Sequence, residues 1–448
     1  MKEDVKDTGI RLLKKGKQTM FKMIFSRSGI ILLLLVIQFL FLFTIFGWFE
    51  EFLPHIYGGV VIFTIFMILY LLNSSMDPTA KISWLVLVML MPVFGALLFL
   101  FTQKNIGHRA LKDRYAQLSQ EKEGMIKQPR RVKEKLQVEN PGIMALNHYV
   151  RQSGCFPIYD QTEVTYFPLG EDKFKEMLIQ LEKAEKFIFL EYFIIDEGKM
   201  WGEILEILAR KAKAGVEVRV LYDGTCELST LPHDYPKRMQ KLGIKCKMFA
   251  PIKPFVSTHY NYRDHRKILV IDGRVAFNGG VNLADEYINE YVKYGHWKDT
   301  AVMLEGKAVQ SFTRMFLHMW NLEEKHPEYQ PYLDVDVEEK RDIKGFVMPY
   351  GDCPLDNDKV GEQVYIDMLN RAQRYIYIMT PYLILDGEME NALEYAAKRG
   401  VDVRIILPGI PDKYIPFSLA LTHYKRLLEA GEDLRIYTGL RSCQSLCQ

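Results

Sequence analysis

From about residue 144 onward, short apolar runs alternate with stretches in which apolar residues recur at helical spacing. Residues 186–195 (KFIFLEYFII) and 216–222 (VEVRVLY) have the length and the β-branched or aromatic content of strands, and residues 202–214 between them have the pattern of an amphipathic helix. This rhythm predicts β-α units around a sheet, and therefore an α/β fold.

The same order returns later in the chain. Residues 374–385 (RYIYIMTPYLIL) predict a strand with its exit, residues 389–399 a helix, and residues 401–407 (VDVRIIL) a strand. Gly215–Arg219 (GVEVR) matches Gly400–Arg404 (GVDVR), with Tyr192 aligned to Tyr382, and a further helix follows each match. Chance is the alternative, because G-V-x-V-R opens many β-α-β strands, but four features in one order favour a duplication. We therefore expect copies at 144–330 and 346–448, joined by an acidic linker at 331–345.

The first hundred residues have a different pattern. Three runs without charge, 30–48, 56–72 and 84–101, each approach the roughly 20 residues that cross a bilayer as a helix. They predict a membrane region at 1–105 with two to three transmembrane helices. A cleaved signal peptide would have a shorter apolar core and no further apolar runs. The third run contains Pro92 and Gly95, so a buried soluble helix is its alternative interpretation.

Charges flanking these runs give conflicting orientations. Basic residues precede the first run and Glu50 and Glu51 follow it, which places the N-terminus in the cytoplasm. The basic linker at 106–143 also favours the cytoplasm, so either the third run is re-entrant or interfacial, or one charge cluster is not decisive. We expect a multi-pass protein of the cell membrane with its catalytic region in the cytoplasm.

Length and composition exclude other classes. A chain of 448 residues predicts more than one domain. Lys and Arg total 58 against 56 Asp and Glu, so no broad cationic surface for nucleic acid is expected. The six cysteines lack C-x-x-C spacing, which argues against a zinc site or a disulfide framework.

Reactive residues gather after the second strand of the first copy. Residues 261–272 read NYRDHRKILVID, which places His265 and Lys267 two positions apart, and Gly279-Gly280-Val281-Asn282 follows a turn. Alternate residues of a strand share a face, so the imidazole and the ammonium are expected at one site. An imidazole nitrogen can attack phosphorus while lysine and carboxamide donors stabilise the charge on the phosphoryl oxygens.

The spacing H-x-K-x4-D-x6-G-G-x-N resembles the signature of the phospholipase D superfamily, and NYRDHRKILVIDG with GGVNLADEY is similar to bacterial cardiolipin synthases. The segments DPTAK at 77–81 and PVFGA at 92–96 resemble the membrane module of that family. The resemblance implies a duplicated α-β-α sheet domain, with its second copy incomplete, after an N-terminal transmembrane helical region.

The resemblance also implies roles for single residues. His265 would be the nucleophile that forms a phosphatidyl-histidine intermediate, with Lys267 and Asn282 binding the phosphate oxygens. Asp299 matches the acid that orients the histidine, although a surface acid in a loop is the alternative. No metal or other cofactor is called for, because Lys267 supplies the cation beside the phosphate.

Other residues of the motif have less direct roles. Asp272 belongs to it, but is expected as an ion-pair or turn-capping residue rather than a catalyst. Gly279 and Gly280 would let the backbone approach phosphate closely. Glu191 and Tyr192 correspond to site-lining residues in similar proteins, with core packing as the alternative.

The second copy lacks a matching motif. Where relatives continue into a second His-x-Lys strand, the sequence after Gly439 reads LRSCQSLCQ, which has no strand pattern. One back-translation of these residues, read in another frame, gives Phe-Val-His-Ala-Lys-Val-Phe-Val, so we expect a truncated product of a frameshifted gene.

The combined prediction is a cardiolipin synthase-like phosphatidyltransferase that condenses two phosphatidylglycerol molecules in the membrane and releases glycerol, with activity impaired by the missing motif. Two alternatives remain at this stage. A phospholipase D-type phosphodiesterase would pass the same intermediate to water, and a catalytically dead membrane protein would only bind lipid.

Overall fold

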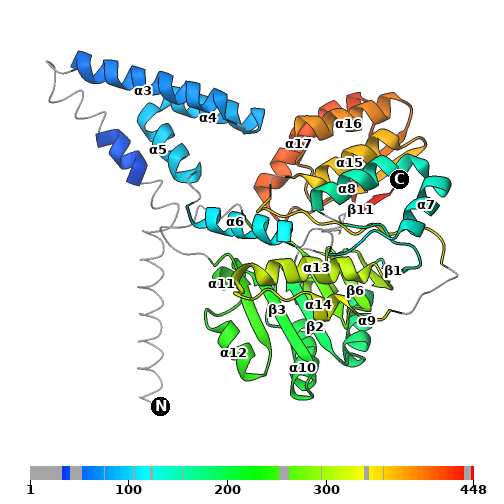
Figure 1. The fold of residues 1–448 in the computed structure, drawn as a ribbon. Coiled ribbons are helices and arrows are strands. Elements are labelled where there is room, and N and C mark those ends of the chain that lie inside the picture. The colour runs from blue at the N-terminus through cyan, green and yellow to red at the C-terminus, as the bar shows by residue number, and fades with distance from the viewer. Residues whose placement is uncertain are drawn as a thin grey trace, which may run out of the picture. The chain divides into compact units, whose positions relative to one another are not determined.

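The computed structural model describes residues 33–40, 53–74, 76–103, 106–121, 125–154, 156–251, 262–293, 295–337, 343–356, 358–437 and 445–447. The chain divides into two compact units, with the boundary between Ala110 and Leu111, and each unit is considered by itself (Figure 1). The first predicted apolar run, 30–48, lies mostly outside the described residues; its described part, 33–40, is helical.

The first unit consists of helices α3 (Leu53–Asn73), α4 (Pro78–Leu90) and α5 (Pro92–Gln103), which pack around a small apolar core. The third apolar run, predicted as one element at 84–101, is divided between α4 and α5. Met91 leaves the helical conformation (φ −136°, ψ 75°) because the residue before a proline is sterically disfavoured in the α region. In the part of the chain that the structure describes, no helix meets the combined length and hydropathy expected of a membrane span.

The segment expected to be a basic linker, 106–143, contains packed structure. Helices α6 (Ile106–Glu121) and α7 (Arg130–Glu139) and the 3-10 turn η1 (Pro141–Ile143) form here. Leu118 and Leu136 are each about 1% exposed or less, because the apolar positions of these helices pack into the second unit. Charge content alone did not reveal these apolar positions.

A seven-stranded sheet organises the first copy, in the order β1-β7-β6-β5-β2-β3-β4. Strands β2, β3 and β4 are parallel and the remaining pairs are antiparallel. The strands are β1 (Glu163–Phe167), β2 (Phe187–Tyr192), β3 (Glu217–Asp223), β4 (Lys245–Phe249), β5 (Lys267–Ile271), β6 (Val275–Gly279) and β7 (Ala301–Glu305). The predicted alternation of strands and helices is confirmed for this copy.

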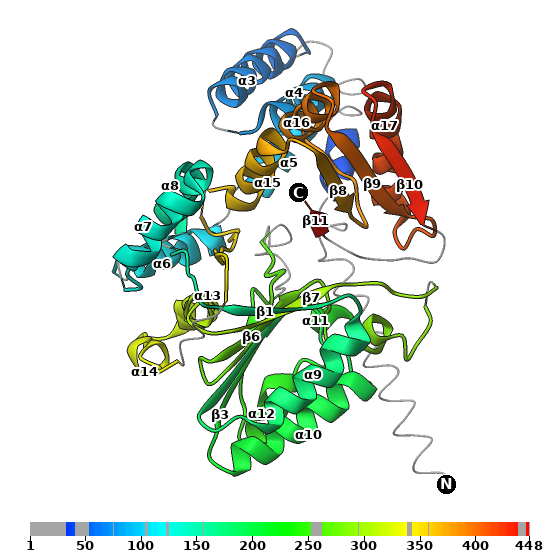
Figure 2. The ribbon, with the colours of Figure 1, turned by 90° about the vertical axis from the view of Figure 1, so that its right-hand side faces the viewer.

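Helices cover both faces of this sheet, since both faces of β2, β3 and β5 carry apolar side chains. One face packs against α9 (Gly170–Glu182), α10 (Lys199–Lys213) and α12 (Tyr235–Lys241), and the other against α13 (Val309–Trp320) and α14 (Gln330–Leu333) (Figure 2). The remaining elements are α8 (Met144–Gly154), α11 (Cys226–Ser229), η3 (Asp285–Ile288) and η4 (Asn321–Glu323). The result is an α-β-α sandwich whose strand ends carry the predicted motif.

The second copy forms a smaller sheet in the order β10-β9-β8-β11. Its elements are α15 (Val360–Arg371), β8 (Tyr375–Met379), α16 (Gly387–Lys398), β9 (Asp402–Pro408), α17 (Tyr414–Glu429), β10 (Asp433–Tyr437) and β11 (Ser445–Cys447). Strand β8 pairs with β9 as β2 pairs with β3, with Ile376 opposite Val403 and Ile188 opposite Val218. The internal repeat is therefore also a repeat of strand pairing.

The strand register shows that one predicted residue match between the two copies is wrong, and it reveals a pair of equivalent strands that the sequence did not predict. Because Ile188 corresponds to Ile376, Tyr192 corresponds to Thr380, and its predicted match with Tyr382 is wrong by two positions. The tail, expected to lack a strand, contributes β11, which pairs antiparallel with β8 as β5 does with β2. An open sheet edge offers backbone partners whatever the side-chain pattern, which explains the missed strand.

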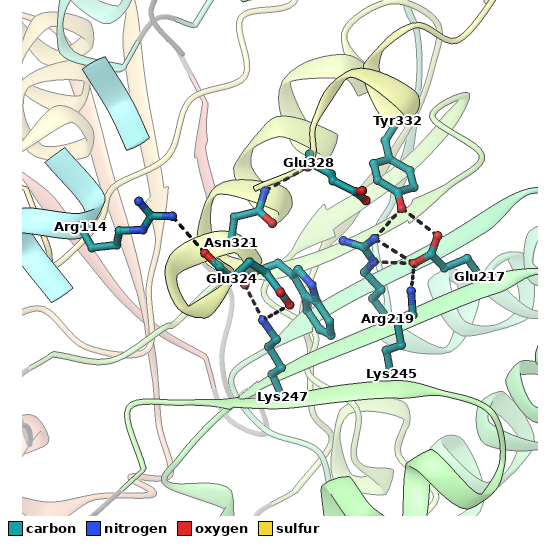
Figure 3. Close-up of polar contacts among 10 residues, drawn as sticks. Arg114, Glu217, Arg219, Lys245, Lys247, Asn321, Glu324, Glu328 and Tyr332 are labelled. Carbon is teal, nitrogen blue, oxygen red and sulfur yellow. Dashed lines mark hydrogen bonds and ion pairs between the residues drawn. The ribbon is translucent and has the colours of Figure 1, made fainter. Parts of the chain in front are cut away.

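The repeated G-V-x-V-R sequence has a structural explanation. In the first copy Arg219 is buried and its guanidinium lies 2.8 Å from Glu217, whose carboxylate also accepts a 2.8 Å hydrogen bond from the Tyr332 hydroxyl (Figure 3). In the second copy Arg404 pairs with Asp402 at 2.7 Å. Tyr332 belongs to the predicted acidic linker, so the part of 331–345 around α14 is packed on the sheet. Residues 338–342 of that linker lie outside the described residues.

Candidate active site

A cavity of about 420 Å³ lies in the second unit, between the strand ends of the two copies. From the first copy it is lined by His265, Lys267 and Asn282, and from the second by Tyr382 and Lys413. The remaining lining residues are Phe193, Ile194, Arg266, Asn278, Gly279, Gly280, Glu286, Tyr287, Lys293, Trp297, Pro381, Pro408 and Asp412. Both copies therefore contribute to one site, although only the first carries the His-x-Lys sequence.

His265 and Lys267 are in direct contact. His265 precedes β5 rather than lying within it, and Lys267 is the first residue of the strand. The Lys267 Nζ donates to the His265 backbone oxygen at 2.6 Å and lies 3.1 Å from Nδ1 of the imidazole. An ammonium has no acceptor lone pair, so Nδ1 accepts and the neutral ring carries its proton on Nε2. The side chain of Phe193 packs against the ring, with centroids 4.6 Å apart.

Charge in the cavity is set by burial and by neighbouring groups. Burial lowers the pKa of Lys267 to about 7, against the opposing effects of Asp264, Asp299 and Asp223. His265 is exposed and lines the cavity, yet the protein around the ring partly desolvates it and lowers its pKa to about 4, with Lys267 and Lys413 adding to the effect. At neutral pH His265 is therefore an uncharged base beside a lysine that titrates readily.

Asn282 and the paired glycines shape the cavity wall. Asn282 is buried; its Oδ1 accepts from the Ile194 backbone N–H at 3.0 Å and its Nδ2 donates to the Tyr287 hydroxyl at 2.9 Å. A Cβ on Gly280 would lie 2.0 Å from an oxygen of Asp299, and one on Gly279, whose φ is +150°, 2.4 Å from a β7-flanking carbonyl. The glycines thus allow the Asp299 segment to approach β6.

Asp299 lies beneath the site and is fully buried. One of its carboxylate oxygens accepts from the Thr300 backbone N–H at 2.9 Å. It raises the pKa of both Lys267 and Lys173, against their burial. The aspartate therefore acts electrostatically on the lysines of the site, in addition to any role in orienting His265.

Three of the residues singled out from the sequence lie away from the cavity. Asp272 is at the far end of β5 from Lys267, about 17 Å along a strand of this rise. Its carboxylate accepts from the backbone N–H groups of Glu185, Lys186 and Phe187 at 2.7–2.8 Å. Its geometry is that of the turn-capping residue that the sequence favoured over a catalyst.

Glu191 and Tyr192, expected among the lining residues, are buried on opposite faces of β2. Glu191 lies 3.5 Å from the guanidinium of Arg266, and burial raises its pKa well above the usual range. The Tyr192 hydroxyl accepts a 3.4 Å hydrogen bond from Lys173. Core packing, the alternative considered from the sequence, describes both positions.

The sequence did not single out Lys173 or Lys413, and it indicated Tyr382 only as a repeat match to Tyr192 and not as a site residue. Lys173 is completely buried, donates to the Val281 carbonyl at 3.1 Å, and has its pKa lowered by burial to about 7. A signal for it exists, since it occupies the face of α9 shared with Met177 and Leu181, where a charge is unusual. Lys413 and Tyr382 have no such local signal, because only the meeting of the two copies brings them to His265.

Comparison with known proteins gives the family. The family described as "Cardiolipin synthase, PLD-like domain" matches residues 177–320 and 365–446, and "Phospholipase_D-nuclease N-terminal" matches residues 62–103. The cardiolipin synthase of Halalkalibacterium halodurans is 32% identical over 85% of this chain and 76% of its own length. The chain belongs to the cardiolipin synthase family of phospholipase D-like proteins. Its mixed α/β phospholipase D-like fold agrees with this membership.

Other relatives span a similar part of this cardiolipin synthase family member. A Streptococcus mutans protein of uncharacterised function is 56% identical over 83% of this chain and 80% of its own length. Among solved structures, the phosphatidylserine synthase of Haemophilus influenzae is similar at 15% identity, covering 67% of this chain and 80% of its own, with a TM-score of 0.48.

The matched family region contains the groups that the cavity brings together. Residues 177–320 include His265, Lys267 and Asn282, together with the buried Asp299, and residues 365–446 include Lys413; of these, all but Asp299 line the cavity. In this cardiolipin synthase family member, a neutral imidazole, an adjacent ammonium and a second-copy lysine therefore face one cavity. Such an arrangement can bind an anionic phosphodiester and attack its phosphorus.

Proposed function

We propose that the chain is a phosphatidyltransferase of the cardiolipin synthase kind. It condenses two phosphatidylglycerol molecules into cardiolipin and glycerol through a phosphatidyl-histidine intermediate on His265. The observation that carries the proposal is the contact of the His265 Nδ1 with the Lys267 ammonium at 3.1 Å inside a cavity formed by both copies of the repeat.

The reaction has two displacements. The phosphate oxygens of the first lipid take up the hydrogen bonds of Lys267, which releases the imidazole lone pair for attack on phosphorus. The bond between phosphorus and the glycerol headgroup oxygen breaks, and that oxygen leaves with a proton. The hydroxyl of a second phosphatidylglycerol then attacks the phosphohistidine, gives up its proton, and frees His265. Lys267, with a pKa of about 7, exchanges these protons, and Lys413 contributes a second lysine to the lining of the same cavity.

The test uses the full chain in phosphatidylglycerol vesicles, with radioactive phosphate in the lipid headgroup. We expect a base-stable, acid-labile label on the protein that His265→Ala abolishes. His296→Ala is the matched control, since its side chain is exposed and paired with Glu171 at 3.8 Å. Label that persists in the His265→Ala protein would contradict the assignment of the nucleophile.

The products distinguish the remaining functions. Cardiolipin with glycerol supports the transferase, whereas phosphatidic acid would identify a phosphodiesterase that uses water. Lipid binding without label or product would identify a protein that has kept the binding site and lost the chemistry.

We also propose that the first unit holds the enzyme at the membrane. Large apolar side chains on α3 and α4, including Ile62, Phe66 and Leu90, are exposed rather than packed, which suits a lipid environment better than water. Their prevalence predicts that the protein stays with the membrane fraction after a carbonate wash at high pH. Recovery of the full chain in the supernatant would contradict membrane association.

A further inference from the structure

The N-terminal half of α17 exposes large apolar side chains. Tyr414 is 81% exposed and Ile415 77%, and Leu419 one turn further along is 45% exposed. Ile410, in the loop before the helix, is exposed as well. No charged residue occurs from position 414 to position 422. An exposed apolar cluster of this kind marks an interaction surface more often than an ordinary solvated face.

The two halves of α17 differ in charge. Its C-terminal half carries Lys425, Arg426 and Glu429, and Arg426 forms an ion pair with Glu390 at 2.6 Å. Apart from Leu428, the exposed large apolar residues of the helix are therefore collected in its N-terminal half. A helix with this arrangement enters an apolar medium by its tip, whereas an amphipathic surface helix lies flat.

This apolar tip begins at the mouth of the proposed active site. The last residue of β9, Pro408, and the following loop residues Asp412 and Lys413 contribute to the lining of the cavity that contains His265. The exposed Tyr414 and Ile415 follow Lys413 directly in the chain. A lipid whose acyl chains lie beside the tip would therefore have its headgroup near the cavity entrance.

Charge around the entrance suits an anionic surface. Lys413 and Lys293 are both exposed and both line the cavity. Lysines beside an apolar insertion add electrostatic attraction to a bilayer of anionic lipid. The exposed apolar side chains and the neighbouring lysines therefore favour the same partner, a bilayer of anionic lipid.

We infer that the apolar tip of α17, formed by Ile410, Tyr414, Ile415 and Leu419, inserts into the surface of an anionic bilayer and places a phospholipid headgroup at the His265 cavity. The inference rests on the proposed function, which makes a membrane phospholipid the substrate. It adds a contact made by the second copy of the repeat, separate from the apolar helices of the first unit.

The direct test is lipid cross-linking. The full chain carries a benzophenone amino acid at position 415, in vesicles of phosphatidylglycerol and phosphatidylethanolamine, and adducts are identified by mass spectrometry. We expect at least a fivefold higher lipid adduct at 415 than at 428, where Leu428 is 53% exposed on the charged half of the same helix. Equal adducts at the two positions, or a cross-linked dimer of the chain in place of lipid, would overturn the inference.

A substitution supplies a kinetic readout. Ile415→Asp should slow label transfer from bilayer phosphatidylglycerol roughly tenfold, since burial of an isoleucine contributes about 1.5–3 kcal/mol. The same variant should retain its rate with short-chain monomeric phosphatidylglycerol, and Leu428→Asp should resemble the unsubstituted chain in both assays.

The two proposals fail in different ways. If Ile415→Asp does not slow labelling from bilayer phosphatidylglycerol while the label still depends on His265, the insertion of α17 is rejected and the proposed chemistry stands. Lipid adducts at position 415 without any phosphohistidine would reject the chemistry and leave the membrane contact standing.

Discussion

Removal of the Asp272 carboxylate should destabilise the second unit without removing the chemistry. The carboxylate accepts three backbone N–H groups, those of Glu185, Lys186 and Phe187, at 2.8, 2.7 and 2.8 Å, and so fixes the start of β2. Hydrogen bonds to a charged group contribute about 1.5–3 kcal/mol each, and water can replace part of this at Glu185 and Lys186. We expect Asp272→Ala to cost about 3–5 kcal/mol of unfolding free energy.

The stability of the Asp272→Asn variant should lie between that of the unsubstituted chain and that of the Asp272→Ala variant. One oxygen of Asp272 accepts from both Lys186 and Phe187, and the amide oxygen of asparagine can keep these bonds. The amide nitrogen of asparagine would instead face the Glu185 N–H, so that two hydrogen-bond donors would meet with no acceptor between them. The expected order of stability is aspartate, then asparagine, then alanine.

The assay is thermal unfolding of the full chain in detergent, combined with His265 labelling at a temperature where every variant is folded. The alanine variant should unfold about 4–7 °C lower, at roughly 1.5 °C per kcal/mol for a unit that spans residues 111–251 and 262–448. Asp234→Ala is the control, because this exposed aspartate forms only a surface ion pair with Arg238. An unchanged unfolding temperature together with lost labelling would refute the capping role and make Asp272 part of the catalytic machinery.

Two further predictions concern the site. The rate of labelling at low substrate should fall below pH 4, where His265 gains a proton, and above pH 7, where Lys267 loses one. The Lys267→Arg variant should lack the fall in rate above pH 7, because arginine stays protonated. A fall that persists in this variant would exclude Lys267 as its origin. In the strand register, Ser445 of β11 is equivalent to Ile268 of β5, the residue that follows His265-x-Lys267 in the first copy. By this alignment Ser442 and Gln444 are equivalent to His265 and Lys267. The double variant Ser442→His with Gln444→Lys should therefore raise cardiolipin formation about 100-fold or more, because it supplies a second acid-base group. Product formation equal to that of the unsubstituted chain would contradict this equivalence, and Ser442→Ala with Gln444→Ala is the matched control.

The sequence determined the features that depend on short-range spacing. Short apolar runs rich in β-branched and aromatic residues predicted β2, β3, β8 and β9, because such side chains suit the pleated, packed surface of a sheet. The spacing of His265 and Lys267 likewise brought their side chains together, since they are separated by one residue at the start of a strand. Membership of the cardiolipin synthase family was also predicted from this motif and is confirmed.

Tertiary structure decided which strand ends and which faces of helices and sheets come together, and therefore which distant residues become neighbours. Asp272 is in the motif with Lys267, yet the length of β5 places it at the other end of the sheet. Lys413 is far from His265 in the chain, yet the two line one cavity because the two copies face each other there. Lys173 extends from α9 into the core, where its charge interacts with those of Asp299 and Lys267 and burial lowers its pKa. Local spacing fixes the direction of a side chain along its own element, whereas strand pairing and helix packing fix what that side chain meets.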